Sequence, residues 1–210
     1  MATLSQATTS IIEAGRRLDA RGWAPAGAGN YSHRLEDERI AITVSGALKG
    51  SLTPDTVMTL DAEGRPQAPL TPSAETPLHL MLYRRDPTVR AVLHTHSVPA
   101  VVLSRLMRRT GTIGFEGYEL LKAFPGVKTH SKRIELPVLD NSQDTHALAQ
   151  GLHRTLKADG PPAFLIRDHG LYAWGDSMGR ALVAIEAAET LLACELELIK
   201  ATGRSRDMAI

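Results

Sequence analysis

The chain has 210 residues, of which 43% are hydrophobic, and its 24 basic and 23 acidic side chains leave a net charge of +1 at pH 7. This length and composition favour one globular domain over residues 1–210, and the balanced charge argues against nucleic acid or an anionic membrane as a partner. No segment approaches the roughly 18 apolar residues of a membrane span, and the N-terminus lacks a signal-peptide pattern, so we expect a soluble, cytoplasmic protein.

The N-terminal half alternates between helical patterns, strand patterns and short loops. In chain order, we predict a helix over residues 4–20, a glycine-rich loop over 27–30, strands over 39–44 and 57–61, and a helix over 75–85. Ser73 is the predicted cap of the second helix. Ser45-Gly46 follows the first strand, and loops at strand ends are where functional sites are commonly built.

The C-terminal half continues this alternation irregularly. In chain order, we predict an apolar strand over 89–93, helices over 97–107 and 118–123, a strand over 134–139, a helix over 144–157, a strand over 163–167 and a long helix from 176 or 177 to about 201. Irregular alternation favours a mixed sheet flanked by helices over a strictly parallel, doubly wound sheet.

The most informative motif is His94-Thr95-His96, at the end of an apolar strand. Residues i and i+2 of a strand point to the same face, so both imidazoles can converge on one ion. His169 closes a second strand-like run, and three imidazoles with an open fourth position are typical of catalytic zinc. A cupin needs a glutamate about four residues after the second histidine, where this chain has alanine and valine, and an amidohydrolase barrel needs roughly 250 residues.

The other histidines and two glutamates carry weaker signals. Five histidines have no partner at matched spacing and are interpreted as surface or helix-face residues: His33, His79, His130, His146 and His153. Glu75 precedes the strand with the two histidines, where it is either a first-turn acid that interacts with the helix dipole or a member of the site. Glu119 has the pattern of a solvated acid paired with a nearby lysine, and on spacing alone few exposed glutamates have a catalytic role.

Three short loops of small residues are rich in backbone amides and hydroxyls. They are residues 27–30, Ser45-Gly46 and Ser73-Ala74. Each alone is a weak phosphate-binding signal and is more often a simple turn. Three such loops in a chain that also carries a metal-binding motif favour a phosphorylated small-molecule substrate.

The order of these motifs resembles the zinc-dependent class II aldolase/adducin family over nearly the whole chain. The matching segments are Gly29-Asn30-Tyr31-Ser32, Ser45-Gly46, Ser73-Ala74-Glu75, His94-Thr95-His96 and His169-Gly170-Leu171. The resemblance implies an α/β fold, a three-layer α/β/α sandwich around a mostly antiparallel central sheet. It also implies a homo-oligomer, a tetramer with its sites near subunit interfaces.

The same resemblance implies the ligands of the site. One zinc ion per chain would lie on His94, His96 and His169. The substrate phosphate would contact Asn30, Ser45, Gly46 and Ser73, with Lys49 as a charge partner.

Other local strings resemble the family's dehydratases of methionine salvage, which remove water from a phosphorylated methylthio sugar. These strings are Gly22-Trp23, Glu119 with Lys122, and HGLYAWG over residues 169–175. The resemblance implies that Glu119 is the general acid and base, with Glu75 near the metal or in a second proton transfer. Two alternatives stay open: a sugar-phosphate aldolase with the same zinc site, and a non-enzymatic module like the adducin head.

Overall fold

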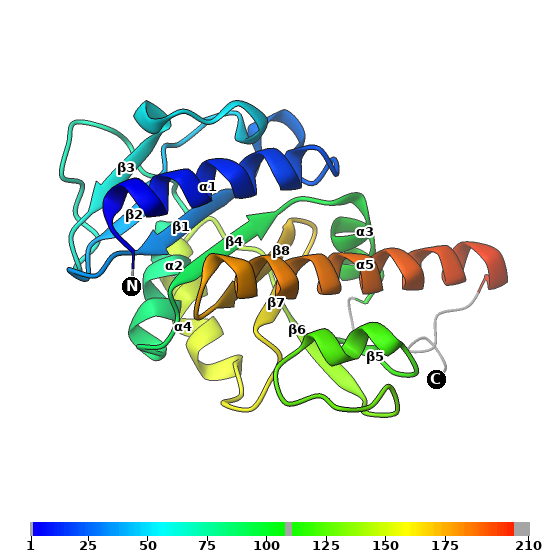
Figure 1. Ribbon diagram of the computed structural model, residues 1–210. Coiled ribbons are helices and arrows are strands. Elements are labelled where there is room, and N and C mark those ends of the chain that lie inside the picture. Colours follow the sequence, from blue (N-terminus) through cyan, green and yellow to red (C-terminus); the bar gives the residue numbers. More distant parts are fainter. Residues whose placement is uncertain (1, 108–110, 204–210) are drawn as a thin grey trace.

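The centre of the protein is a mixed sheet, seen in a computed structural model that describes residues 2–107 and 111–203 (Figure 1). Within these residues the sheet has eight strands in the order β3-β2-β1-β4-β8-β7-β6-β5. The strands are β1 (Asn30–Arg34), β2 (Ile40–Thr43), β3 (Val57–Leu60), β4 (Ala91–Thr95), β5 (Thr112–Phe115), β6 (Ile134–Leu139), β7 (Ala163–Ile166) and β8 (Gly170–Gly175). The β6–β7 pair is parallel and the other neighbouring pairs are antiparallel, so the prediction of a mostly antiparallel sheet is confirmed.

Helices cover both faces of the sheet and complete three layers. On one face pack α1 (Leu4–Asp19), α3 (Val98–Leu106), α5 (Met178–Thr202) and the 3₁₀ helix η4 (Glu119–Ala123), and on the other pack α2 (Thr76–Arg85) and α4 (Thr145–Thr155). Three further 3₁₀ turns are η1 (Pro25–Gly27), η2 (Lys49–Ser51) and η3 (Pro54–Thr56). In Figure 1, α1 and α5 lie in front of the strands. The predicted α/β/α sandwich is confirmed, and no described helix is long and apolar enough to cross a membrane.

Strand β4 positions the site because both of its faces are covered. Leu93 packs into the core under α1, α3 and α5, whereas Val92 packs into the core under α2 and α4. Side chains alternate along a strand, so His94 continues on the face of Val92 and Thr95 on the face of Leu93. The two residues therefore reach different layers of the fold, although they are neighbours in the sequence.

The ends of α5 follow the usual capping rules, whereas the predicted cap of α2 has to be corrected. The Ser177 side chain accepts from the Arg180 amide at the start of α5, and Gly203 ends that helix in the left-handed region at a φ of 66°. The prediction that Ser73 caps α2 is wrong, because the helix begins later and Glu75 occupies the N-cap position. The Ser73 hydroxyl instead accepts from the Glu75 amide at 3.3 Å, which shapes the loop before the helix.

Strands β1, β5 and β8 were not predicted, and residues 119–123 form a 3₁₀ helix rather than an α-helix. Glycine at both ends of β8 weakens the strand signal in the sequence. The structure requires Gly170, because a Cβ atom there would lie 2.1 Å from the carbonyl oxygen of Thr95. The missed strand is thus held in place by a close backbone contact with β4.

Candidate metal centre

Four side chains from three parts of the chain converge beyond the end of β4. His94 and His96 come from β4 and the residue after it, His169 from the turn between β7 and β8, and Glu75 from the N-terminus of α2. Their ligand atoms all lie within 4.8 Å of one another. The structure therefore brings together all three predicted metal ligands and one of the two predicted catalytic acids. We call these four residues the metal cluster.

The distances within the metal cluster are short and its nitrogen atoms face one another. The Nε2 atom of His94 lies 2.8 Å from that of His96 and 3.4 Å from that of His169. The two Glu75 oxygens lie 2.8 Å from Nε2 of His169 and 3.4 Å from Nε2 of His94. Three imidazoles and a carboxylate at one point form a donor set typical of a divalent metal.

The tautomer of His94 tests whether a metal fits this arrangement. Its Nδ1 atom lies 3.0 Å from the carbonyl oxygen of Leu171, which can only accept, so Nδ1 carries the hydrogen. The Nε2 atom of His94 therefore presents a lone pair to the other imidazoles. A second ring hydrogen bond to a backbone carbonyl is the usual support for a histidine that binds a metal. The donor set fits a divalent cation.

Aromatic stacking fixes the plane of the His94 ring. The Tyr172 ring stacks on it at 3.9 Å between centroids with an angle of 11° between the planes. Phe164 stacks on the other side of Tyr172 at 4.8 Å and 5°. Tyr172 was not predicted as a site residue, although it occupies the position opposite His94 in the β4–β8 register. Register across an unpredicted strand pair leaves no local signal in the sequence.

The charges of the metal cluster suit a ligand set. Burial raises the pKa of the Glu75 carboxyl, but the imidazoles of His94 and His169 outweigh this and hold it well below its ordinary value. Burial lowers the pKa of His96 to about 3, and the neighbouring imidazoles of His94 and His169 act in the same direction. Glu75 is therefore ionised and His96 is neutral at physiological pH, as metal coordination requires.

The interpretation of His33 as a surface or helix-face residue is wrong, and His79 lies on a face of α2 but is buried rather than exposed. His79 is fully buried on α2, and His33 is 8% exposed on β1. Nε2 of His79 lies 2.5 Å from Oδ1 of Asn30, and burial, the largest cause, together with the neighbouring imidazole of His94 lowers the pKa of His79 to about 3. One signal was present in the sequence, since His79 follows Glu75 by four residues on the same face of the helix.

The predicted phosphate contacts are only partly brought together. The Asn30 amide donates to Oγ of Ser73 at 3.1 Å and to Glu75 at 2.6 Å, so these two residues border the metal cluster. Lys49 is 2% exposed, and its ammonium group donates to two backbone carbonyls at 2.6 and 2.5 Å. Burial lowers the pKa of Lys49, although the charge of Glu75 opposes this. Ser45 and Gly46 follow β2 in the adjoining loop, where Gly46 has a φ of 75°.

Glu119, the other predicted catalytic acid, lies elsewhere within one chain. It begins η4, its side chain is 71% exposed, and it forms ion pairs with Lys122 and with His130, the latter at 3.3 Å. The hydrogen bond from Lys122 is the main cause that lowers the pKa of Glu119. The structure therefore gives Glu119 solvent, a lysine and a histidine as neighbours.

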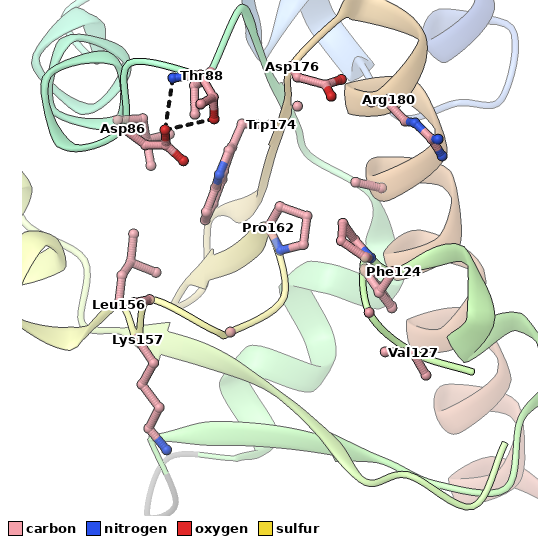
Figure 2. A pocket seen from close by; sticks show the side chains of 18 of the residues that line it. Asp86, Thr88, Phe124, Val127, Leu156, Lys157, Pro162, Trp174, Asp176 and Arg180 are labelled. Atoms are coloured by element: carbon pink, nitrogen blue, oxygen red, sulfur yellow. Dashed lines mark hydrogen bonds between the residues drawn. The ribbon is translucent and has the colours of Figure 1, made fainter. Parts of the chain in front are cut away.

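A cavity lies at the opposite ends of β4 and β8 from the metal cluster. It has a volume of about 890 Å³ and reaches from Val89, before β4, to Gly175, at the end of β8. Figure 2 shows Trp174, Phe124 and Pro162 among the side chains that line it. None of the described residues in its lining is one of the predicted site residues. The chemistry of the metal cluster is therefore separate from this cavity.

Comparison with known proteins agrees with the fold. The family described as Class II Aldolase and Adducin N-terminal domain matches residues 9–196. A methylthioribulose-1-phosphate dehydratase of Granulibacter bethesdensis is 50% identical over 196 residues, which cover 91% of each chain. One of Hahella chejuensis is 50% identical over 192 residues, which cover 90% of this chain and 92% of that one.

A solved structure gives the same relationship at the level of the fold. L-fuculose-1-phosphate aldolase from Thermus thermophilus superposes with a TM-score of 0.70 at 27% identity, over 93% of this chain and 98% of that one. The family model matches residues 9–196, and the two dehydratases are each 50% identical to this chain over about nine tenths of its length. The chain therefore belongs to the class II aldolase and adducin family.

Proposed function

We propose that the chain removes water from 5-methylthioribulose 1-phosphate and produces 2,3-diketo-5-methylthiopentyl 1-phosphate, as a hydro-lyase of methionine salvage. The observation that supports this most is the metal cluster of Glu75, His94, His96 and His169. It occurs in a chain that is 50% identical, over about nine tenths of its length, to proteins named methylthioribulose-1-phosphate dehydratase.

We assign one zinc ion per chain to His94, His96 and His169. Three neutral imidazoles with an open fourth position are the ligand set of many catalytic zinc sites. When bound, the ion supplies Lewis-acid stabilisation of negative charge that develops on substrate oxygens. The hydrogen bond from His94 to the carbonyl of Leu171 supports the assignment, because it aims a lone pair at the centre of the cluster.

The reaction needs a base for the C3 hydrogen and an acid for the C4 hydroxyl group. Removal of the C3 proton leaves an electron pair that forms the C3–C4 double bond. The C4–O bond breaks, and the hydroxyl leaves as water with the proton taken from C3. The resulting enol tautomerises to the diketone, so the net change is the loss of one water molecule. One carboxylate can make both proton transfers.

We assign these transfers to Glu119 of a neighbouring copy in a homotetramer. Its exposed side chain is accessible to a second chain, and Lys122 keeps it in the ionised form that accepts a proton. Glu75 comes from the same chain as the three histidines, and its carboxylate lies 2.8 Å from Nε2 of His169. It is therefore assigned to the support of the metal cluster and to a second proton-transfer role.

We assign the substrate phosphate to Ser45, Gly46, Lys49 and Ser73, and Asn30 holds Ser73 in this group through the hydrogen bond from its amide. The Ser73 hydroxyl accepts from Asn30 and from the Glu75 amide, so its own hydrogen is left for donation. The Lys49 ammonium group uses two of its three hydrogens on backbone carbonyls, which leaves one for an anion.

The assay of two substrates on one zinc-loaded preparation tests the proposal. With 5-methylthioribulose 1-phosphate, we expect the loss of one water molecule and no cleavage of the carbon skeleton. With L-fuculose 1-phosphate, we expect no carbon–carbon cleavage. Turnover of the second substrate alone would contradict the proposal and identify an aldolase, the activity in the name of the structurally similar protein from Thermus thermophilus.

Mixed oligomers test the assignment of Glu119. A chain with Glu119→Gln keeps the histidines, and a chain with His96→Ala keeps Glu119, so each alone is expected to be inactive. If the two groups meet across a subunit boundary, unfolding and refolding the two chains together restores part of the wild-type activity. Refolding Glu119→Gln with itself is the control. Failure of the mixture to regain activity would contradict the assignment.

A further inference from the structure

A chain of hydrogen bonds runs through the interior from α2 to the metal cluster. Tyr83 lies 2.7 Å from the hydroxyl of Ser32, which lies 2.7 Å from Nδ1 of His79. Nε2 of His79 lies 2.5 Å from Oδ1 of Asn30, and Nδ2 of Asn30 lies 2.6 Å from Oε2 of Glu75. The first four residues are at most 3% exposed, so water does not compete for these contacts.

The direction of each hydrogen bond follows from the end at Glu75. A carboxylate can only accept, so the Asn30 amide nitrogen donates to it, and the Asn30 oxygen must face His79. That oxygen can only accept, so Nε2 of His79 carries the hydrogen. Nδ1 of a neutral His79 is then an acceptor, and it takes the hydrogen of Ser32. Tyr83 must donate to Ser32, because the single hydrogen of Ser32 is already used.

The opposite tautomer of His79 would break the link to the metal cluster. A lone pair on Nε2 would face the lone pairs of the Asn30 oxygen. Rotation of the Asn30 amide would relieve this contact, but it would then turn the Asn30 oxygen toward the carboxylate of Glu75. Asn30 can donate to Glu75 without such a clash only while His79 donates to Asn30.

We infer that His79 is a positioning residue for Glu75. By donating from Nε2, His79 orients the Asn30 amide, and the Asn30 amide in turn holds the Glu75 carboxylate beside the three histidines of the metal cluster. Its effect on turnover rests on the proposed function, whereas its effect on metal affinity does not. Asn30 also donates to Ser73, so its amide is fully used within the protein. Its main role is then the support of Glu75 rather than a direct contact with phosphate.

Two substitutions of His79 separate this role from simple packing. The amide nitrogen of glutamine reaches the position of Nε2, whereas the shorter asparagine reaches only the position of Nδ1. His79→Gln therefore retains a donor to Asn30, and His79→Asn loses it. Tyr83→Phe is the matched control, because it removes the outermost hydroxyl without changing the donor to Asn30.

The first readout is the dissociation constant for zinc, measured by chelator competition. Loss of a supporting hydrogen bond around a metal site typically costs about 10- to 100-fold in affinity or activity. We expect about a tenfold or greater loss of zinc affinity in His79→Asn, and values within about threefold of wild type in His79→Gln and Tyr83→Phe. With the proposed substrate, kcat of His79→Asn should fall by a similar factor with little change in KM.

Equal zinc affinity in His79→Asn and His79→Gln would overturn the inference, whether both match wild type or both are weakened. If wild type does not dehydrate the substrate, the proposed function fails, but the comparison of zinc affinities still decides the inference. Nitrogen NMR of wild-type protein with labelled histidine gives a second test, which does not depend on whether the His79→Asn variant folds. A neutral His79 with its hydrogen on Nε2 is expected, and a hydrogen on Nδ1 would overturn the inference.

Discussion

The hydroxyl of Thr95 donates to Oε1 of Glu189 at 2.5 Å, so the residue between His94 and His96 is bound to α5. Ser97 donates to the other oxygen of the same carboxyl group. Glu189 is 1% exposed, and burial raises its pKa to about 7 even though both hydroxyls favour the ionised form. The segment that carries His94 and His96 is therefore anchored to a buried acid on the opposite face of the sheet.

This acid predicts a pH dependence of stability. Because the pKa of Glu189 is about 7 in the folded chain and 4.5 ordinarily, the folded chain binds more protons than the unfolded chain between these values. The contribution of Glu189 to the free energy of unfolding therefore falls as pH rises through this window. Relative to wild type, Glu189→Gln should gain on the order of 3 kcal/mol between pH 4.5 and pH 8.

Urea denaturation of both proteins at the two pH values measures this gain, and subtraction of the wild-type values removes the titration of other groups. The Glu189 account is contradicted by a difference between the two proteins that stays constant with pH.

Removal of one imidazole should abolish stable metal binding. His96→Ala or His169→Ala leaves two histidines and Glu75 in the metal cluster, and the position of the lost imidazole has no protein donor, so the three-histidine set of the assigned zinc site is broken. Elemental analysis is expected to give about one zinc per chain in wild type and a small fraction of that in either variant. His146→Ala, on an exposed position of α4, is the control and should retain its zinc. Full zinc content in both cluster variants would rule out the three-histidine site.

Gly170→Ala should disturb the metal cluster through the backbone. The added Cβ would lie 2.1 Å from the carbonyl oxygen of Thr95 and 3.0 Å from Cε1 of His94. Strands β4 and β8 must then separate, at a cost of about 1–3 kcal/mol of stability and with weaker zinc binding. Gly179→Ala, in α5, meets no atom within 4 Å and should leave stability unchanged or raise it by up to about 1 kcal/mol. Thermal denaturation of both variants measures the contrast.

The assignment of Glu119 to a neighbouring copy requires an oligomer in solution. For a tetramer of 22.7 kDa chains, four times the chain mass predicts about 91 kDa. Multi-angle light scattering at micromolar concentration gives this mass directly. A value near that of one chain would exclude the proposed assembly and, with it, the role of Glu119 across a boundary.

The three histidines of the metal cluster were predictable because their signals are local. His94 and His96 are two residues apart on a strand, and His169 ends a recognisable apolar run. The same holds for the starts of α4 and α5, predicted at residue 144 and at 176 or 177, where Asp144 and Ser177 accept hydrogen bonds from the first turn.

The remaining site residues depend on contacts between distant segments. His79 is buried because Asn30 and Ser32, on a strand more than 40 residues earlier in the sequence, supply its hydrogen-bond partners. Glu189 reaches Thr95 across 94 residues. Neither relationship has a periodicity that a sequence reveals, and the proposed role of Glu119 depends on a second copy of the chain.

The most direct test of the account uses 5-methylthioribulose 1-phosphate that carries deuterium at C3, incubated with the zinc-loaded protein and analysed by mass spectrometry. The account predicts one organic product that has lost one water molecule and the C3 deuterium, because the base removes that hydrogen and the C4 hydroxyl departs. Products from carbon–carbon cleavage, unchanged substrate, or a dehydrated product that retains its C3 label would contradict it.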